Sequence, residues 1–321
     1  MRALVTGGAG FIGSGLVERL LVEGHEVDTI DDLSTGTLSN LAGARGRGGG
    51  GGRFSFHRFD IRSPELVDLV ARREPEVVFH FAAQADVRVS IADPAHDAGV
   101  NVIGSLHLLE GARRAGARKV VFAGSGGTLY GAPTDLPTPE SHPHQPISPY
   151  GVAKKAVGDY LHYYAAVHGL DYAVLALANV YGPRQDPFGE AGVVAIFARR
   201  LLDGLPVTIY GDGNQTRDFV YVDDVVDAFA RAKEPGAASG LVVNVGTGAE
   251  TSVNDVYVIM ARLTGTPAEA VHAPARPGEV IRSALDPRLA GTALGWKPAT
   301  TLEEGLGATL DWFRSRPPAV S

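Results

Sequence analysis

A tyrosine and a lysine near the middle of the chain have the residue types and the spacing needed to move a proton. Tyr150 and Lys154 lie four residues apart, directly after Ser148 and Pro149. Four residues is about one helical turn, so both side chains are expected on one face of a helix, where an ammonium group lowers the pKa of a neighbouring phenol. The pair is therefore predicted to act as a general base with its electrostatic partner. On an ordinary helix the same spacing would give only a solvated face.

A glycine-rich turn near the start of the chain is typical of a dinucleotide site. Gly7, Gly10 and Gly13 follow a short apolar run and open an amphipathic stretch. The first glycine permits a tight turn, the second lets a pyrophosphate approach the backbone, and the third lets helix and strand pack closely. About 20 residues further on, Asp31 and Asp32 would accept hydrogen bonds from ribose hydroxyls and favour NAD over NADP, with no adjacent arginine for a 2′-phosphate. Two solvated turn aspartates are the alternative.

The elements that must position these residues alternate along the chain. Short apolar runs bounded by glycine predict parallel strands, and the longer amphipathic runs between them predict crossover helices. The predicted strands cover residues 3–6, 26–30, 53–58, 77–81, 119–123, 172–177 and 241–245, and the predicted helices 11–23, 64–73, 95–115, 150–168 and 223–232. We therefore predict an α/β fold with a Rossmann-type doubly wound parallel sheet, which binds ligands at the carboxyl ends of its strands.

The pattern changes after Asn179, where glycine and proline punctuate shorter segments. We expect residues 1–178 to form an NAD-binding Rossmann domain, to which the chain returns at about 219–247. Residues 179–321 are expected to form mainly a smaller C-terminal α/β lobe that binds the substrate. The glycine-rich segment 46–52 is predicted to be a flexible surface loop, because no helix N-terminus follows it.

Composition excludes several classes of protein. The 321 residues carry a net charge of -7, and the 29 Lys and Arg are scattered, so no basic stripe points to a nucleic-acid or membrane partner. The absence of cysteine excludes disulfides and thiolate metal sites, and the ten histidines lack metal-ligand spacing. No signal-peptide core or membrane-length apolar run is present, so we expect a cytoplasmic protein without a metal.

Several further motifs resemble the extended short-chain dehydrogenase/reductase family, and within it the UDP-glucose (UDP-galactose) 4-epimerase type. Besides the glycine turn and the Tyr/Lys pair, they are His80 to Gln84, Asn101 to Gly104, Asn179 to Gln185, Gly211 to Gly213, Thr216 to Asp224 and Arg276 to Glu279. The resemblance covers nearly the whole chain. It implies inversion at C4 of a UDP-hexose through a 4-keto intermediate, with hydride transfer to and from bound NAD, by a homodimer.

The resemblance also implies roles for individual residues. Tyr150 would remove the proton of the sugar 4-hydroxyl, and Lys154 would orient the nicotinamide ribose. Ser125 or Thr128 would hydrogen-bond O4; the choice stays open, because Gly126 occupies the position where many relatives carry this hydroxyl. The cofactor-binding residues would be Gly7, Gly10, Phe11, Ile12, Gly13, Asp31, Asp32, Asp60 and Ile61 (both at the adenine), Phe81, Ala82, Ala83, Gln84, Asn101, Tyr150 and Lys154.

For the substrate, the resemblance implies contacts in the C-terminal lobe. The expected residues are Asn179, Arg217 and Arg276 at the diphosphate, Val194 and Phe197 near the uracil, Tyr210 at the ribose, Glu279 beside Arg276, and Ser125 at the sugar. Ordinary interlobe salt bridges are the alternative for the two arginines. Ser283 is small and would stand beside the C2 substituent, so UDP-GlcNAc and UDP-GalNAc are expected as substrates alongside UDP-Glc and UDP-Gal.

Three other functions share this fold. A nucleotide-sugar 4,6-dehydratase needs an Asp-Glu pair just before the aromatic residue of the Ser/Thr loop, where this chain has Gly126, Gly127 and Thr128. A UDP-glucuronate epimerase or decarboxylase would need a cation for the substrate carboxylate, such as Arg88 or Arg184. A non-catalytic NAD-binding regulator would not need the intact Tyr/Lys pair.

Overall fold

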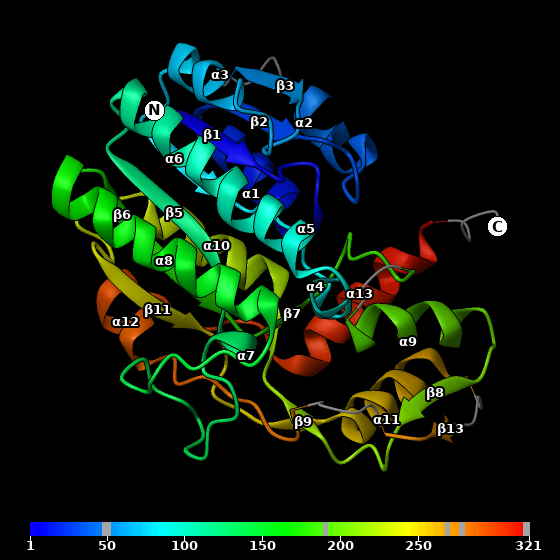
Figure 1. Cartoon of the computed structure of the whole chain (residues 1–321). Helices are drawn as coiled ribbons and strands as arrows, with labels where there is room; N and C mark the ends of the chain where they lie inside the picture. Colours follow the sequence, from blue (N-terminus) through cyan, green and yellow to red (C-terminus); the bar gives the residue numbers. More distant parts are fainter. Residues whose placement is uncertain (47–52, 189–191, 267–269, 276–279, 317–321) are drawn as a thin grey trace.

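A seven-stranded parallel sheet forms the centre of the molecule, with helices on both faces (Figure 1). The computed structural model describes residues 1–46, 53–188, 192–266, 270–275 and 280–316. The strands are β1 (Arg2–Thr6), β2 (Glu26–Asp31), β3 (Phe54–Arg58), β4 (Val77–His80), β5 (Lys119–Ser125), β6 (Asp171–Leu177) and β11 (Leu241–Val245). Their spatial order is β3-β2-β1-β4-β5-β6-β11, and all neighbours pair in parallel. This order confirms the doubly wound α/β prediction.

Two hydrophobic cores lie on the two faces of the sheet, because successive side chains of a strand point to opposite faces. Ala3 and Val5 pack with the helices of one face, and Leu4 packs with those of the other. The first face carries α1 (Phe11–Val22), α10 (Val222–Ala232) and α12 (Arg288–Leu294). The short elements η1 (Leu38–Leu41) and α2 (Ala42–Gly46) lie near these helices. The second face carries α3 (Leu66–Arg73), α6 (Gly104–Ala115) and α8 (Pro149–His168). Figure 1 shows α6 and α8 crossing in front of the strands.

The helix predicted over residues 95–115 is divided into three pieces. These are α5 (Pro94–Ala98), a π-helical turn η2 (Gly99–Ile103) and α6, and the unpredicted helix α4 (Val87–Ala92) precedes them. A π-helical turn accommodates an extra residue within a helix and often marks a functional site. Here the turn contains the buried Asn101.

The second half of the chain builds a smaller lobe, which it leaves to rejoin the sheet at β11 and then re-enters. The lobe core is formed mainly by α9 (Val193–Leu202), α11 (Val253–Thr264) and α13 (Leu302–Arg314), with β8 (Val207–Tyr210) and β10 (Phe219–Tyr221). The remaining short elements are β7 (Asn179–Tyr181), β9 (Thr216–Arg217), β12 (Thr251–Ser252), β13 (Ala270–Ala273) and α7 (Gly126–Leu129). β10 pairs in parallel with β7, α10 packs on α1, and β11 joins the sheet beside β6. Most of the predicted loop 46–52 lies outside the described residues.

Asp218 joins three segments that are remote in the sequence. It is 1% exposed, and its Oδ1 accepts hydrogen bonds from the backbone N–H (2.8 Å) and the hydroxyl (2.6 Å) of Thr247. Its Oδ2 accepts hydrogen bonds from the backbone N–H groups of Gly248 and Leu285, both at 3.1 Å. One carboxylate thus connects β10, the loop after β11 and the segment that leads to α12.

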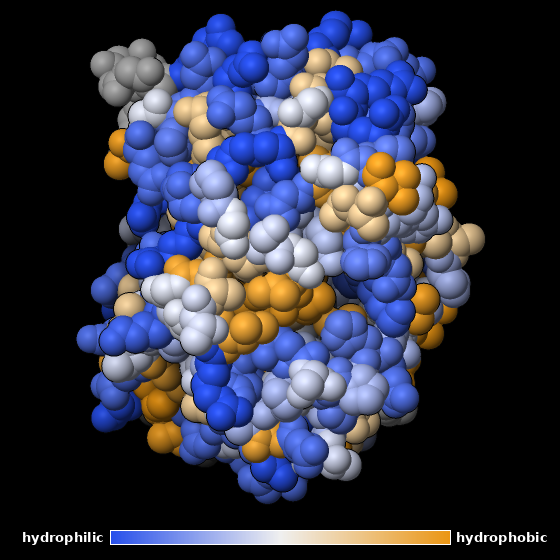
Figure 2. Space-filling view, turned by 90° about the vertical axis from the view of Figure 1, so that its left-hand side faces the viewer, coloured by the Kyte–Doolittle hydropathy of each residue, from blue (hydrophilic) through white to orange (hydrophobic). Residues whose placement is uncertain are grey.

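Apolar side chains also occur on the surface. The face at the left of Figure 1 is mostly hydrophilic, with hydrophobic side chains gathered across its middle (Figure 2). A separate apolar stripe runs along α8, where Val152, Tyr160, Tyr163 and Val167 are exposed at helical spacing. Within the described part of the chain, no helix is long and apolar enough to cross a membrane.

Replacing Asp218 by alanine is expected to lower the free energy of unfolding by about 2–4 kcal/mol, because buried donors lose their acceptor. Urea denaturation followed by circular dichroism would measure the change. Asp159→Asn is the control, because Asp159 makes one exposed salt bridge of 2.8 Å to Lys155 on α8, and such pairs contribute at most about 1 kcal/mol. Equal effects of the two substitutions would show that Asp218 does not join these segments.

Candidate active site

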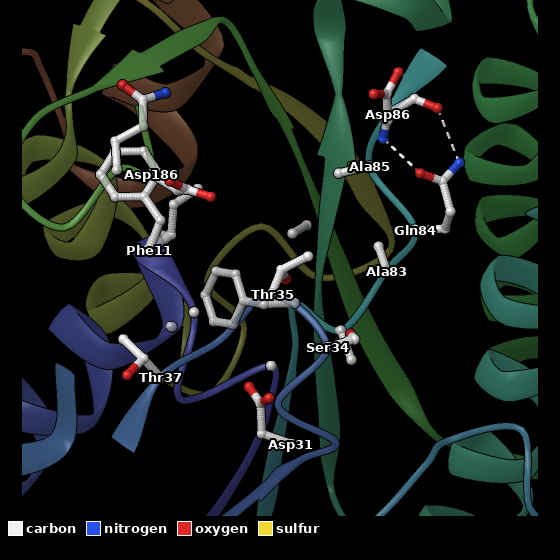
Figure 3. A pocket seen from close by; sticks show the side chains of 18 of the residues that line it. Phe11, Asp31, Ser34, Thr35, Thr37, Ala83, Gln84, Ala85, Asp86 and Asp186 are labelled. Atoms are coloured by element: carbon white, nitrogen blue, oxygen red, sulfur yellow. Dashed lines mark hydrogen bonds between the residues drawn. The ribbon is translucent and has the colours of Figure 1, made fainter. Parts of the chain in front are cut away.

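A cavity of about 950 Å³ lies at the carboxyl ends of the central strands (Figure 3). It is lined by residues that end β1, β2, β4 and β5 and by residues that begin α1 and α8. The strand order reverses between β1 and β4, which is where doubly wound sheets form a ligand crevice. All predicted cofactor residues except Asn101 line this cavity. Asn101 is buried behind it and hydrogen-bonds to Gln84.

The glycine turn packs as the sequence predicts. Gly7 has φ +67°, and a Cβ there would lie 2.6 Å from the backbone nitrogen of Ala82. A Cβ at Gly13 would lie 2.3 Å from the carbonyl oxygen of Gly7, so this glycine allows α1 to approach the turn. Gly10 is the N-cap of α1 and provides no capping side chain. The N–H groups at the start of α1 and the positive end of its dipole therefore suit a phosphate in the cavity.

Asp31 is a buried carboxylate at the end of β2. Its Oδ2 accepts a hydrogen bond from the backbone N–H of Ala9 (2.9 Å), and its Oδ1 accepts one from that of Leu33 (2.8 Å). Burial raises the pKa of this carboxyl, although both hydrogen bonds favour the charged form. Each oxygen can accept a further bond from a ribose hydroxyl. Asp32 also lines the cavity, but its carboxylate mainly closes a turn by accepting from the N–H (2.8 Å) and hydroxyl (2.6 Å) of Ser34.

Two arginines lie near these carboxylates, although the sequence shows none beside Asp31. The Nη2 of Arg62 donates to Oδ2 of Asp60 at 2.6 Å, and this contact lowers the pKa of the Asp60 carboxyl. The Nε of Arg58 donates to the backbone carbonyl of Asp32 at 3.4 Å. Sequence reasoning missed both because Arg58 ends a different strand, β3, and Arg62 follows that strand. The Asp60 carboxylate is thus engaged by an arginine, whereas the buried Asp31 carboxylate accepts, within the described residues, only from backbone N–H groups.

Helix α8 places Tyr150 and Lys154 together on the cavity wall. The helix begins at Pro149, and the Ser148 hydroxyl caps its first turn. The Nζ of Lys154 donates to the carbonyl of Ala123 at 3.0 Å and lies 5.6 Å from the centroid of the Tyr150 ring. Burial lowers the pKa of Lys154 to about 8. The pair therefore belongs to a partly dry cavity wall and not to a solvated helix face.

The two candidate hydroxyls lie just beyond the part of β5 that lines the cavity. Ser125 ends β5 and is half-buried, and among the described residues no hydrogen-bond partner of its hydroxyl is found. The Thr128 hydroxyl donates back to the Ser125 carbonyl at 3.5 Å. At Gly126 a Cβ would lie 2.3 Å from a terminal methyl group of Leu285, so a side chain at this position would require Leu285 to move.

Among the described residues, none of those predicted to bind the substrate lines the cavity described above. Val194 and Phe197 are 1% exposed and pack inside the lobe core, so their contact with a uracil stays a prediction. Of the others, Asn179 is exposed on β7, Tyr210 is exposed at the end of β8, Arg217 is half-buried on β9, and Ser283 is half-buried before α12. Arg276 and Glu279 lie outside the described residues. No group of His, Asp or Glu suited to a metal ion occurs among the residues that the structure describes.

A loop that sequence reasoning did not assign to the cofactor site also lines the cavity. It contains Arg184 and Asp186, and Figure 3 shows Asp186 beside Phe11, away from Gln84. Arg184 has φ +73°, and its guanidinium donates to the Ser14 hydroxyl at 3.1 Å and to Glu18 Oε2 at 2.7 Å. The loop is therefore anchored to α1. The motif Asn179 to Gln185 includes Arg184, so it was the sequence feature from which this part of the cavity wall could have been predicted.

Comparison with known proteins agrees with this geometry. Residues 3–246 match the model of the NAD dependent epimerase/dehydratase family. The chain is 50% identical to a UDP-glucose 4-epimerase of Mycolicibacterium smegmatis, over 98% of this chain and 99% of that protein. Its structure matches that of UDP-glucose 4-epimerase with UDP-glucose from Thermotoga maritima, with a TM-score of 0.93 and 47% identity over 98% and 99% of the two chains. It also matches UDP-glucose 4-epimerase in complex with NAD from Thermus thermophilus, with a TM-score of 0.90 and 44% identity over 98% and 99%.

These matches confirm the resemblance that the motifs indicate, and they extend over both the sheet and the C-terminal lobe. This chain belongs to the NAD dependent epimerase/dehydratase family.

Proposed function

We propose that this protein inverts C4 of a UDP-hexose, interconverting UDP-glucose and UDP-galactose with NAD as a resident cofactor. The observation that carries the proposal is the position of Tyr150 and Lys154 on one wall of a cavity that also contains the glycine turn. The names of the similar proteins support the UDP-hexose substrate. The reaction needs both a base and a dinucleotide site, so neither a base alone nor a dinucleotide site alone would support it.

The cavity residues fit NAD along its length. The start of α1 would hold the pyrophosphate, Asp31 would accept from the adenosine ribose, and Lys154 would donate to the nicotinamide ribose. When bound, NAD would take up the hydride of C4 and return it. The absence of a side chain at Gly7 lets the turn after β1 pack against the backbone of Phe81 and Ala82, which also line the cavity.

Tyr150 would hold the proton during the reaction. Its phenolate accepts the proton of the 4-hydroxyl as C4 is oxidised, and the phenol returns that proton as C4 is reduced on the other face. The ammonium group of Lys154, 5.6 Å from the Tyr150 ring, stabilises the phenolate. Because the proton leaves and returns at one oxygen, the reaction needs no second acid.

We assign the hydroxyl that steadies O4 to Ser125. Ala123 and Gly124, just before it on β5, line the cavity. Its hydroxyl has no partner among the described residues, whereas the hydroxyl of Thr128 is engaged by the Ser125 carbonyl. A hydroxyl directed at a developing oxyanion is most effective when it has no competing acceptor.

In the lobe, Asn179, Arg217 and Arg276 are proposed for the diphosphate, because guanidinium groups bind it in a bidentate manner. Ser283 is small, so the space beside C2 is proposed to admit an acetamido group.

A homodimer is proposed to form through α8. Helix α8 carries an exposed apolar stripe, formed by Val152, Tyr160, Tyr163 and Val167, which would pack against the same stripe of the partner subunit. Helix α6 of each subunit would complete a four-helix interface. Apart from the local backbone of α8, no described atom lies within 4 Å of the position that a Cβ of Gly158 would take, so a helix of the partner subunit could approach α8 closely there. Ala153, in contrast, is buried toward the sheet.

The activity is tested by incubating the protein with UDP-glucose and measuring UDP-galactose by NMR. Tyr150→Phe is expected to lower kcat by about 10³-fold or more, because the base is lost. Tyr164→Phe removes a buried hydroxyl from the same helix and should leave kcat close to the wild-type value. A stable 4-keto-6-deoxy product would instead identify a dehydratase, and no conversion of any UDP-hexose would contradict the proposal. UDP-GlcNAc and UDP-GalNAc are assayed in parallel, because their turnover tests whether the space beside Ser283 admits an acetamido group.

The assignment of the hydroxyl is tested in the same assay. Ser125→Ala is expected to lower kcat by about 10²-fold, the effect of removing one oxyanion donor. Thr128→Val keeps the shape of the side chain and should have a much smaller effect. The opposite ranking would transfer the role to Thr128.

Light scattering coupled to gel filtration is expected to give twice the mass of one chain. The double substitution Tyr163→Glu and Val167→Glu places charges in the α8 stripe and should give the monomer mass. Val258→Glu changes an exposed valine on α11 and serves as the control. A wild-type monomer, or a dimer that persists in the double variant, would contradict this interface.

A further inference from the structure

Asp97, on α5, is a buried carboxylate that the proposed mechanism does not use. It is 1% exposed, and its Oδ1 accepts hydrogen bonds from the side-chain amides of Gln84 and Asn101, both at 2.9 Å. Its Oδ2 is also buried, but no hydrogen-bond donor for it exists among the described residues. A buried carboxylate oxygen without a donor is costly, so a favourable interaction of another kind is needed.

Lys154 is a buried cation that needs a negative charge. It is 5% exposed, and it forms no salt bridge with any residue that the structure describes. Its Nζ has one hydrogen bond, to the Ala123 carbonyl, and lies 4.6 Å from the centroid of the Phe122 ring. A carbonyl and ring faces stabilise an ammonium group only in part.

The two charges belong to one buried layer, because α5 and η2 both pack against α8. A continuous set of contacts crosses this layer. The carbonyl of Asn101 accepts from the Ser105 hydroxyl (2.5 Å), which also bonds to Nε2 of His80 (2.8 Å). The His80 ring lies 5.4 Å from the ring of Phe122, on which the ammonium of Lys154 rests.

The charged groups that face this layer influence one another. Burial lowers the pKa of Lys154 to about 8, and the charge of Asp97 opposes that decrease. Burial raises the pKa of Asp97, whereas its amide donors and the charges of Lys154 and His96 lower it. Burial also lowers the pKa of His80 to about 3, so His80 stays neutral at working pH. Tyr150 is the remaining ionisable group, on the same helix as Lys154.

We propose that Asp97 is the counter-ion that keeps Lys154 protonated, and that it positions the cofactor side of the cavity. The second role acts through Asn101, which exchanges hydrogen bonds with the backbone of Gln84: Gln84 N–H to Asn101 Oδ1 (3.0 Å) and Asn101 Nδ2 to the Gln84 carbonyl (2.9 Å). Gln84 lines the cavity, whereas Asp97 does not. Asp97 is thus a positioning residue. The inference rests on the proposed function only for the catalytic role of Lys154.

The direct test is the pKa of Lys154 in the full-length protein, with and without added NAD, by NMR of [13Cε]lysine. The chain has only five lysines, and Lys154→Met assigns the signal. Asp97→Asn keeps an oxygen that can accept from Gln84 and Asn101 but removes the charge. It should lower the pKa of Lys154 by about 0.5–1 pH unit, because an opposite charge has been lost.

Asp93→Asn is the matched control. It makes the same change four residues earlier, at the N-cap of α5, where asparagine is also a good cap. The pKa of Lys154 should not change in this variant. An unchanged pKa in Asp97→Asn would overturn the inference. If Asp97→Asn does not fold, carboxyl 13C NMR of Asp97 in Lys154→Met decides the question, because loss of the ammonium must raise the pKa of Asp97.

The pH dependence of activity provides a separate test of the role of Asp97. The ammonium of Lys154 must be present for turnover, so the alkaline limb of the kcat/KM profile should move to lower pH in Asp97→Asn, with Tm close to the wild-type value. An alkaline limb that stays in place would overturn the role of Asp97 in the reaction. If the NMR change occurs but no UDP-hexose is converted, the proposed function fails while the pairing of the two charges stands.

Discussion

A buried ammonium group is stable only where the protein replaces the water that it has lost. Lys154 is in this position, and much of the site is organised around it. The end of β5 supplies the Ala123 carbonyl, and the Phe122 ring supplies an apolar support with a negative face. The residue that benefits is Tyr150, one turn earlier on α8. A lysine in water would exert a weaker field on that phenol, because solvent would screen it.

The fold supplies this environment through the parallel sheet. Strands that run in one direction bring their carboxyl ends to one edge, so the glycine turn after β1, Asp31 at the end of β2 and the end of β5 surround one cavity. The lobe that closes the crevice is connected to the sheet by buried polar contacts. Asp218 is the clearest of these, because its two oxygens accept hydrogen bonds from two other segments, residues 247–248 and Leu285.

Local packing also bears on the proposed choice between the two candidate hydroxyls. The methyl groups of Leu285, in the segment before α12, lie where a side chain at position 126 would begin, so Gly126 allows this segment to pack as it does. The nearest hydroxyls are those of Ser125 and Thr128, and the hydrogen bond of Thr128 to its own helical turn separates them. The absence of a side chain at position 126, in contrast, goes with a contact between residues about 160 positions apart in the chain.

The sequence by itself determined the sheet, the glycine turn and the face shared by Tyr150 and Lys154, because each follows from spacing within a few residues. Only the tertiary structure divided the helix at Asn101, buried Val194 and Phe197 in the lobe core, and placed Asp97 in the buried layer that holds Lys154. These features depend on contacts between distant segments. Periodicity shows which face of an element is apolar, but it does not show which other element packs against that face.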